Sequence, residues 1–267
     1  MGDINKDNPL LDRKYCYHGL GGAVFRLSSI LERGVLPPRD IKSIDMPENF
    51  DSNHSYNGPN LVSVIMSPQF CSGSDTLGDK YSNGITFVCE QEYWRGPQAK
   101  ASGISFEAHT SSIPPEKIKG IILPNTFFEK PIKDCGDFFG GERQYESICK
   151  AFQKFMKEEC NYDTQGYDIE LRLIKACKDF LQKDKYKDKL KAHVFSDLQE
   201  AIDKKLGKKN STFADIVNFY IKDKPHIKLY NRETLQKDIT RPNNIEKKLQ
   251  ETINIPFIAL NKSRYYK

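Results

Sequence analysis

The pattern of hydrophobic and polar positions changes near residue 140. Before it, short apolar segments alternate with clusters of Gly, Pro, Ser and Asn, which is typical of strands separated by turns. After it, apolar side chains recur at helical spacing over longer stretches. We therefore predict an α+β chain with a sheet-containing core in residues 1–139 and a helical lobe in residues 140–267.

Five segments of the first part predict strands, because they are short and rich in β-branched and aromatic residues. They are KYCYHGL (14–20), LVSVIMS (61–67), GITFVCE (84–90), ISFEAHT (104–110) and KIKGIILP (117–124). One helix is predicted after the first strand, ending at Gly34, because four apolar residues share a helical face: Val24, Leu27, Ile30 and Leu31. The stretch GPQAKASG (96–103) is predicted to be a loop.

The second part contains three apolar stripes at helical spacing, followed by a further helix. The stripes are Tyr145, Ile148, Cys149, Phe152, Phe155 and Met156; Leu173, Ile174, Cys177, Phe180 and Leu181; and Leu190, Val194, Leu198, Ala201 and Ile202. The further helix, STFADIVNFYIK (211–222), begins with a Ser-Thr cap. A late strand is predicted within residues 253–267.

Composition and charge narrow the classes of function. The net charge of +5 over 267 residues is mild, so nucleic acid is not expected as a partner. The seven cysteines contain no C-x-x-C pair, which indicates neither a disulfide framework nor a zinc site and favours a reducing compartment. We expect no metal and no membrane span, because no H-x-x-x-H pair and no run of about 18 apolar residues occurs.

Two residues within predicted strands are candidates for chemistry. His18 lies at the end of the first strand, just before the helix. Glu107 is a carboxylate within a strand-like segment, where acidic residues are disfavoured unless they face solvent or a site. Considered singly, each also fits a structural role, since histidine is often partly buried and a strand carboxylate can simply face solvent.

The motif YHGL (17–20), with a helix that leads into SILERGVLPP (29–38), resembles the start of the ADP-ribosyltransferase fold. The resemblance is to its histidine-bearing branch, which includes diphtheria-toxin-like enzymes and poly-ADP-ribose polymerases. Three later segments are similar to later elements of the family in the same order: VSVIMSPQF (62–70), KYSNGITFVCE (80–90) and ISFEAHTSSIPPEKIKGIILP (104–124). The resemblance covers residues 15–125, and Leu20 departs from it, because the family has Thr or Ser there.

The resemblance implies a split β-sheet core that binds NAD as a substrate. His18 would hydrogen-bond the ribose attached to adenine, and the backbone of Gly19 would bind the nicotinamide amide. Tyr81 would stack on the nicotinamide ring, and Ser63 or Ser67 would line the same pocket. A glycine suits this role because it lets a backbone approach a ligand closely, and stacking is a favourable arrangement for aromatic rings.

Glu107 would accept a hydrogen bond from the 2′-hydroxyl of the nicotinamide ribose and stabilise the positive charge that develops on that sugar. Glu92 is an alternative catalytic glutamate, because the triplet Glu90-Gln91-Glu92 matches the Glu-x-Glu pattern of arginine-modifying members. Ser105 occupies the corresponding position before Glu107. We favour Glu107, because a Gly- and Ala-containing loop leads into its strand, as it does in the family.

The implied function is NAD-dependent mono-ADP-ribosylation of a protein side chain with release of nicotinamide. An RNA 2′-phosphotransferase of the same fold is an alternative, although arginines are few and scattered before residue 125. A catalytically degenerate scaffold that binds a protein partner through its helical lobe is a third possibility. We expect a cytoplasmic protein, or a toxin-like bacterial effector that a specialised system delivers into a host cytosol to modify a host protein. The oligomeric state stays open.

Overall fold

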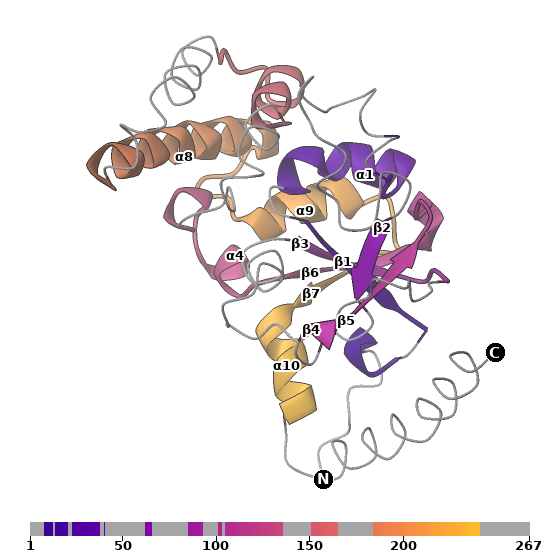
Figure 1. The fold of residues 1–267 in the computed structure, drawn as a ribbon. Helices are drawn as coiled ribbons and strands as arrows, with labels where there is room; N and C mark the ends of the chain where they lie inside the picture. Colours follow the sequence, from indigo (N-terminus) through magenta and orange to yellow (C-terminus); the bar gives the residue numbers. More distant parts are fainter. Residues whose placement is uncertain are drawn as a thin grey trace, which may run out of the picture.

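The computed structural model describes residues 8–12, 14–20, 23–37, 40, 62–65, 85–92, 101–102, 105–135, 151–164 and 184–240. In this part of the chain, helices and strands are mixed around one sheet, so the predicted α+β class is confirmed. Figure 1 shows the sheet at the centre, with α1 and α9 above it and α10 below.

Among the described residues, seven strands form the sheet, in the order β4-β5-β2-β1-β3-β6-β7. Their bounds are Cys16–Leu20 (β1), Val62–Ile65 (β2), Ile85–Cys89 (β3), Ala101–Ser102 (β4), Ser105–Thr110 (β5), Ile118–Leu123 (β6) and Lys228–Asn231 (β7). Neighbouring strands are antiparallel, except that β6 and β7 are parallel. The central strand β1 therefore has β2, β5 and β4 on one side and β3, β6 and β7 on the other. We call β2 and β5 the outer strands.

The five strands predicted from the sequence are confirmed, each within two residues of its expected ends. Two other strands correct the prediction. Ala101–Ser102, expected to belong to a loop, pairs with the start of β5. Lys228–Asn231 pairs with β6, although it lies in the part predicted to be helical. Both strands are too short to show a periodicity, and each forms because an existing strand offers unpaired backbone groups at its edge.

The helix after β1 begins with a 3-10 turn, Ala23–Arg26, and continues as α1, Leu27–Arg33. It ends at Gly34, as predicted, with φ 86° and ψ −173°. Helix α9, Phe213–Ile221, begins with a capping box in which the Thr212 and Asp215 side chains bond each other's backbone N–H. Both helices cover the same face of the sheet (Figure 1).

The remaining helical elements connect and surround this core. They are the 3-10 turns Pro9–Leu11, Pro115–Lys117 and Ile132–Asp134, the short helix α4 (Thr126–Glu129), the π-helical turn Phe155–Glu159, the long helix α8 (Asp184–Leu206) and α10 (Arg232–Thr240). Within the described ranges, none of the helices combines the length and apolar character that crossing a membrane requires.

Two hydrophobic clusters lie on the two faces of the sheet. The larger one unites α1, α8 and α9 with β3, β6 and the segment 151–160. The smaller one lies on the opposite face, under the 3-10 turn Pro9–Leu11 and α10, and consists of Tyr17, Ile65, Val88, Ile122 and Leu235. The sheet is thus buried on both faces around β1.

The C-terminal part shares the larger cluster with the N-terminal part. The Phe127 and Phe213 ring centroids are 4.6 Å apart, and those of Phe25 and Phe152 are 5.2 Å apart. The predicted apolar stripes are buried at their described positions, which are Phe152, Phe155, Met156, Val194, Leu198, Ala201 and Ile202. The boundary after residue 139 stays a prediction, and the late strand predicted within 253–267 lies outside the described residues.

Candidate functional site

His18 and Gly19 lie in the central strand, immediately before the chain enters the first helix. Their Cα partners on β3 are Phe87 and Thr86, both almost fully buried. His18 is half-buried and Gly19 is buried. The strand-to-helix junction predicted for these two residues is therefore present, and it lies in the middle of the sheet rather than at an edge.

Two hydrogen bonds link the start of β1 to the N-terminal turn and that turn to α10. The Tyr17 hydroxyl donates to the Pro9 carbonyl oxygen at 2.6 Å. The Asn8 side-chain amide donates to the Leu235 carbonyl oxygen at 3.0 Å, which joins the N-terminal turn to α10. Burial raises the pKa of Tyr17 well above its usual range. Tyr17 therefore stays neutral and serves as a buried anchor next to His18.

The register places Glu107 in one row with the start of β1. Tyr17 is the Cα partner of Ile65 on β2, and Ile65 is the Cα partner of Glu107 on β5. Two inter-strand spacings separate Tyr17 from Glu107, which is about 10 Å between their backbones. The fold thus brings together two predicted site segments that lie about 90 residues apart in the sequence.

Glu107 is level with Tyr17 in this row, so it is offset by one residue from His18. In a flat sheet, positions 18 and 107 would belong to opposite faces, because successive residues of a strand alternate. However, among the described residues β1 has five registered pairs with β3 and one, Tyr17–Ile65, with β2. A single registered pair allows the β2–β5 pair to lie at an angle to β1.

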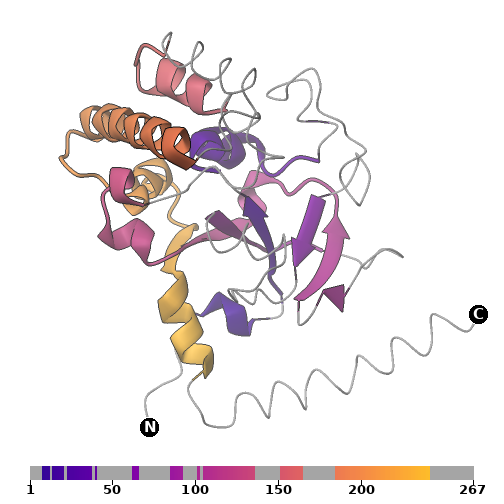
Figure 2. The same ribbon diagram turned by 60° about the vertical axis from the view of Figure 1, so that its left-hand side comes forward.

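A hydrogen bond at the far end of β5 shows that the outer strands do turn. A flat sheet would place Thr110 level with Leu20, at the end of β1. Instead, the Thr110 hydroxyl donates to the Glu92 carbonyl oxygen at 2.7 Å. The neighbouring Gln91 carbonyl oxygen accepts a bond from the Cys16 thiol, at the start of β1. The β2–β5 pair thus crosses β1 at an angle, and Figure 2 shows these two strands standing apart from the central one.

The alternative glutamate, Glu92, lies outside the sheet. It follows the end of β3 and is exposed, whereas the register partner of His18 on that strand is five residues earlier. With Lys14, Glu90, Gln91 and Lys117 it lines an open hollow of about 750 Å³. Glu107 thus lies within the sheet and Glu92 outside it, and the choice of catalytic glutamate stays a prediction.

The other predicted NAD contacts are only partly described. Ser63 lies on β2, and its Cα partner is His109 on β5. Ser67 and Tyr81 lie outside the described residues. The nicotinamide-stacking role predicted for Tyr81 and the pocket-lining role predicted for the serines accordingly stay predictions.

The cysteines near the site are structural. Cys16 and Cys89 are Cα partners on β1 and β3, and both are fully buried. Burial raises the pKa of the Cys16 thiol to about 11 and that of Cys89 well above its usual value. Both side chains are protonated at neutral pH, which excludes them as thiolate nucleophiles.

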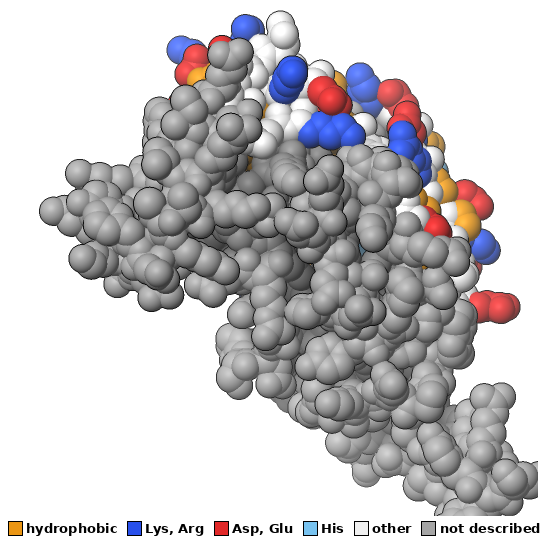
Figure 3. Space-filling model, turned by 45° about the horizontal axis from the view of Figure 1, so that its top comes forward, with side chains coloured by type: hydrophobic (Ala, Val, Ile, Leu, Met, Phe, Trp, Pro, Cys, Tyr) orange, Lys and Arg blue, Asp and Glu red, His pale blue; other side chains and the backbone are white. Residues whose placement is uncertain are grey.

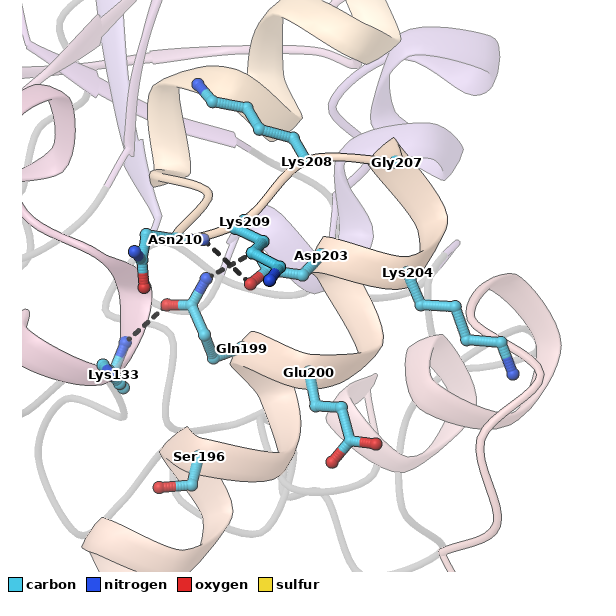
Figure 4. Close-up of a pocket in the computed structure, with 10 residues that line it drawn as sticks. All are labelled: Lys133, Ser196, Gln199, Glu200, Asp203, Lys204, Gly207, Lys208, Lys209 and Asn210. Carbon is cyan, nitrogen blue, oxygen red and sulfur yellow. Dashed lines mark hydrogen bonds between the residues drawn. The ribbon is translucent and has the colours of Figure 1, made fainter.

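A second hollow, of about 710 Å³, lies where α8 ends (Figure 4). The Asp203 carboxylate accepts bonds from the Asn210 and Ser211 backbone N–H groups and from the Gln199 side chain. Gln199 in turn accepts from the Lys133 backbone N–H. These bonds order the turn between α8 and α9, so the polar groups here hold the fold together. No pattern in the sequence predicted this network.

The surrounding surface carries charges of both signs. On the face drawn in Figure 3, Lys and Arg side chains lie next to Asp and Glu side chains across the part that is described. Among the described residues, no three His, Cys, Asp or Glu side chains gather closely enough to hold a metal ion. Comparison of the chain with models of protein families, with curated proteins and with solved structures found no match.

Proposed function

We propose that this chain is an NAD-dependent mono-ADP-ribosyltransferase that modifies a protein side chain and releases nicotinamide. The observation that carries the proposal is the row Tyr17–Ile65–Glu107, which brings the predicted catalytic glutamate to the strand of His18 and Gly19. The motif resemblance and this spatial relationship are independent, because nothing in the local motifs determines which strands become neighbours.

The glycine in β1 supports a role in ligand binding. Gly19 directly follows His18 within the strand and is buried. A glycine lets a ligand approach the backbone closely, as the proposed contact with the nicotinamide amide requires.

The proposed chemistry breaks the bond between C1′ of the ribose and the nicotinamide nitrogen. The bonding electrons leave with nicotinamide, and the positive charge that develops on the ribose is stabilised by the Glu107 carboxylate through the 2′-hydroxyl. A nucleophilic side chain of the acceptor protein then forms the new bond to C1′ and gives up its proton. Holding the reactants in position accounts for most of the acceleration.

The direct test is nicotinamide release from NAD, measured by chromatography with and without acceptor proteins. We expect Glu107→Gln to lower the rate at least about 100-fold, the usual effect of losing one electrostatic stabiliser. Glu92→Gln should stay within about threefold of the wild-type rate. Glu116→Gln, at an exposed position in the turn after β5, is the matched control.

Binding separates the proposed roles of the two residues. Calorimetry with NAD should show weaker binding for His18→Ala and nearly unchanged binding for Glu107→Gln. A wild-type chain that neither binds nor cleaves NAD would exclude the proposed enzyme and favour a binding scaffold. A Glu92→Gln variant that loses activity while Glu107→Gln retains it would move the catalytic role to Glu92.

A further inference from the structure

We propose that Thr110 is a positioning residue whose hydroxyl fastens the strand of Glu107 to the strand pair that carries His18. The inference rests on the proposed function, in which Glu107 and His18 act on one NAD molecule. No sequence motif had indicated a function for Thr110.

The Thr110 hydroxyl bond is short, and its donor residue is buried. Thr110 is fully buried, and its hydroxyl donates to the Glu92 carbonyl oxygen at 2.7 Å. Thr110 is the last residue of β5, three positions after Glu107, so the bond lies about 10 Å along the strand from the proposed catalytic position. Glu92 lies three residues after the end of β3, which is paired with β1 throughout. One hydrogen bond thus links the two strands through a short, continuous path.

This bond gives the outer strands a second directional restraint. Strands β2 and β5 are paired with each other at four positions, whereas Tyr17–Ile65 is the one registered pair of β2 with β1 among the described residues. Val62 and Val64 also pack in the larger hydrophobic cluster, but apolar packing is non-directional, so a hydrogen bond at a second point adds a restraint on rotation about that pair. Farther along the chain, Val35 and Ile113 exchange two backbone hydrogen bonds, which hold the segment after β5 but not the strand itself.

Small changes in position matter for the proposed chemistry. Displacing a catalytic group by about 1 Å can lower a rate about 100-fold without weakening substrate binding to other groups. Loss of the Thr110 hydroxyl should therefore affect turnover more than affinity for NAD. A residue with a purely structural role would lower stability without separating these two quantities.

The test compares three variants with the full-length wild-type chain. Thr110→Val keeps the branched shape and removes the donor, whereas Thr110→Ser keeps the donor and removes a methyl group. Ser111→Ala is the matched control, because the exposed Ser111 hydroxyl makes a long bond, 3.5 Å, to the next residue. Far-UV circular dichroism and thermal unfolding establish that each variant is folded.

The first measurement is amide hydrogen exchange, which does not depend on any reaction. In Thr110→Val, amides of residues 105–110 should exchange about tenfold faster, while those of β1 and β3 should be unchanged. Thr110→Ser and Ser111→Ala should match the wild-type chain. Unchanged exchange of β5 in Thr110→Val would overturn the anchoring role, whatever the activity of the protein.

The second measurement is the kinetics of nicotinamide release. Thr110→Val should lower kcat about 10- to 100-fold with KM for NAD within about threefold, and Thr110→Ser should restore most of the rate. Equal kcat for Thr110→Val and the wild-type chain would overturn the positioning role while leaving the enzyme intact. If the wild-type chain releases no nicotinamide, the proposed function is wrong, and so is the catalytic part of this inference. Hydrogen exchange then tests by itself whether the Thr110 hydroxyl anchors β5.

Discussion

Gly34 packs directly against the backbone of Ile113, so closely that a Cβ atom on Gly34 would lie 2.0 Å from the Ile113 carbonyl oxygen. Gly34 ends the helix that follows His18, and Ile113 lies three residues after β5. The neighbouring Val35 and Ile113 exchange backbone hydrogen bonds of 2.8 and 2.9 Å. The two segments that frame the proposed site are therefore joined at their far ends through a contact that only glycine permits.

We expect Gly34→Ala to destabilise the chain by about 3 kcal/mol or more. Its φ of 86° and ψ of −173° lie in a region that is essentially restricted to glycine, and the added methyl group also meets backbone atoms that cannot move aside. Chemical denaturation measures the free energy of unfolding. Gly207→Ala is the matched control, because Gly207 also has a positive φ, 64°, but nothing lies within 4 Å of its Cβ position. The control should lose only about 1 kcal/mol, and equal losses would contradict the packing argument.

The ring of Tyr230, on β7, packs closely over Gly120 on β6. A Cβ on Gly120 would lie 2.6 Å from a carbon of the Tyr230 ring. We expect Gly120→Ala to cost about 1–3 kcal/mol, as overpacking usually does. A double-mutant cycle with Tyr230→Leu should recover about 1 kcal/mol of this loss, because the smaller side chain makes room. Strictly additive effects would show that the two residues do not press on each other.

A fragment of residues 1–139 should not fold cooperatively. It lacks Phe152 and Phe213, whose rings pack against Phe25 and Phe127, and it also lacks β7. Its sheet would expose a large apolar area that the full-length chain buries. Thermal unfolding followed by circular dichroism, together with binding of a hydrophobic dye, provides the test. A sharp transition at a temperature near that of the full-length chain would instead support an independent domain that ends at residue 139.

The turn after α8 should make stability depend on pH in the acid range. Burial acts to raise the pKa of Asp203, but hydrogen bonds from Ser211, Gln199 and Asn210 outweigh it and hold the pKa below its usual value. A lowered pKa in the folded state stabilises the protein above about pH 4, where the carboxyl group is ionised also in the unfolded chain. This contribution is lost as the pH falls through the lower, folded-state pKa.

Denaturation of Asp203→Asn and the wild-type chain at several pH values measures this contribution. The variant should be less stable by about 1–3 kcal/mol at pH 7, the range for hydrogen bonds to a charged group. The difference should shrink as the pH falls below 4. Glu200→Gln changes an exposed carboxylate one residue from Gln199 and should have little effect at any pH. A constant difference between Asp203→Asn and the wild-type chain would contradict an ionised Asp203 as the acceptor.

Local patterns were sufficient to predict most of the elements. Short runs of β-branched and aromatic residues predicted β1, β2, β3, β5 and β6, Gly34 predicted the end of the helix after β1, and the Ser-Thr cap predicted the start of α9. These features depend on residues adjacent in the chain, which is why a sequence pattern reveals them. The motif around His18 and Gly19 likewise predicted a strand-to-helix junction, and the structure has it.

The tertiary structure alone decided which of these elements meet. The neighbours of β1, the row that joins Tyr17 to Glu107, the bond from Thr110 to Glu92 and the pairing of β7 with β6 all link residues distant in the sequence. Such contacts depend on how whole strands and helices pack together and on which strand edges remain open, and neither leaves a periodic signal in the chain. The sequence by itself therefore determined most of the elements and the candidate residues, whereas the packing of the sheet determined which of them are neighbours.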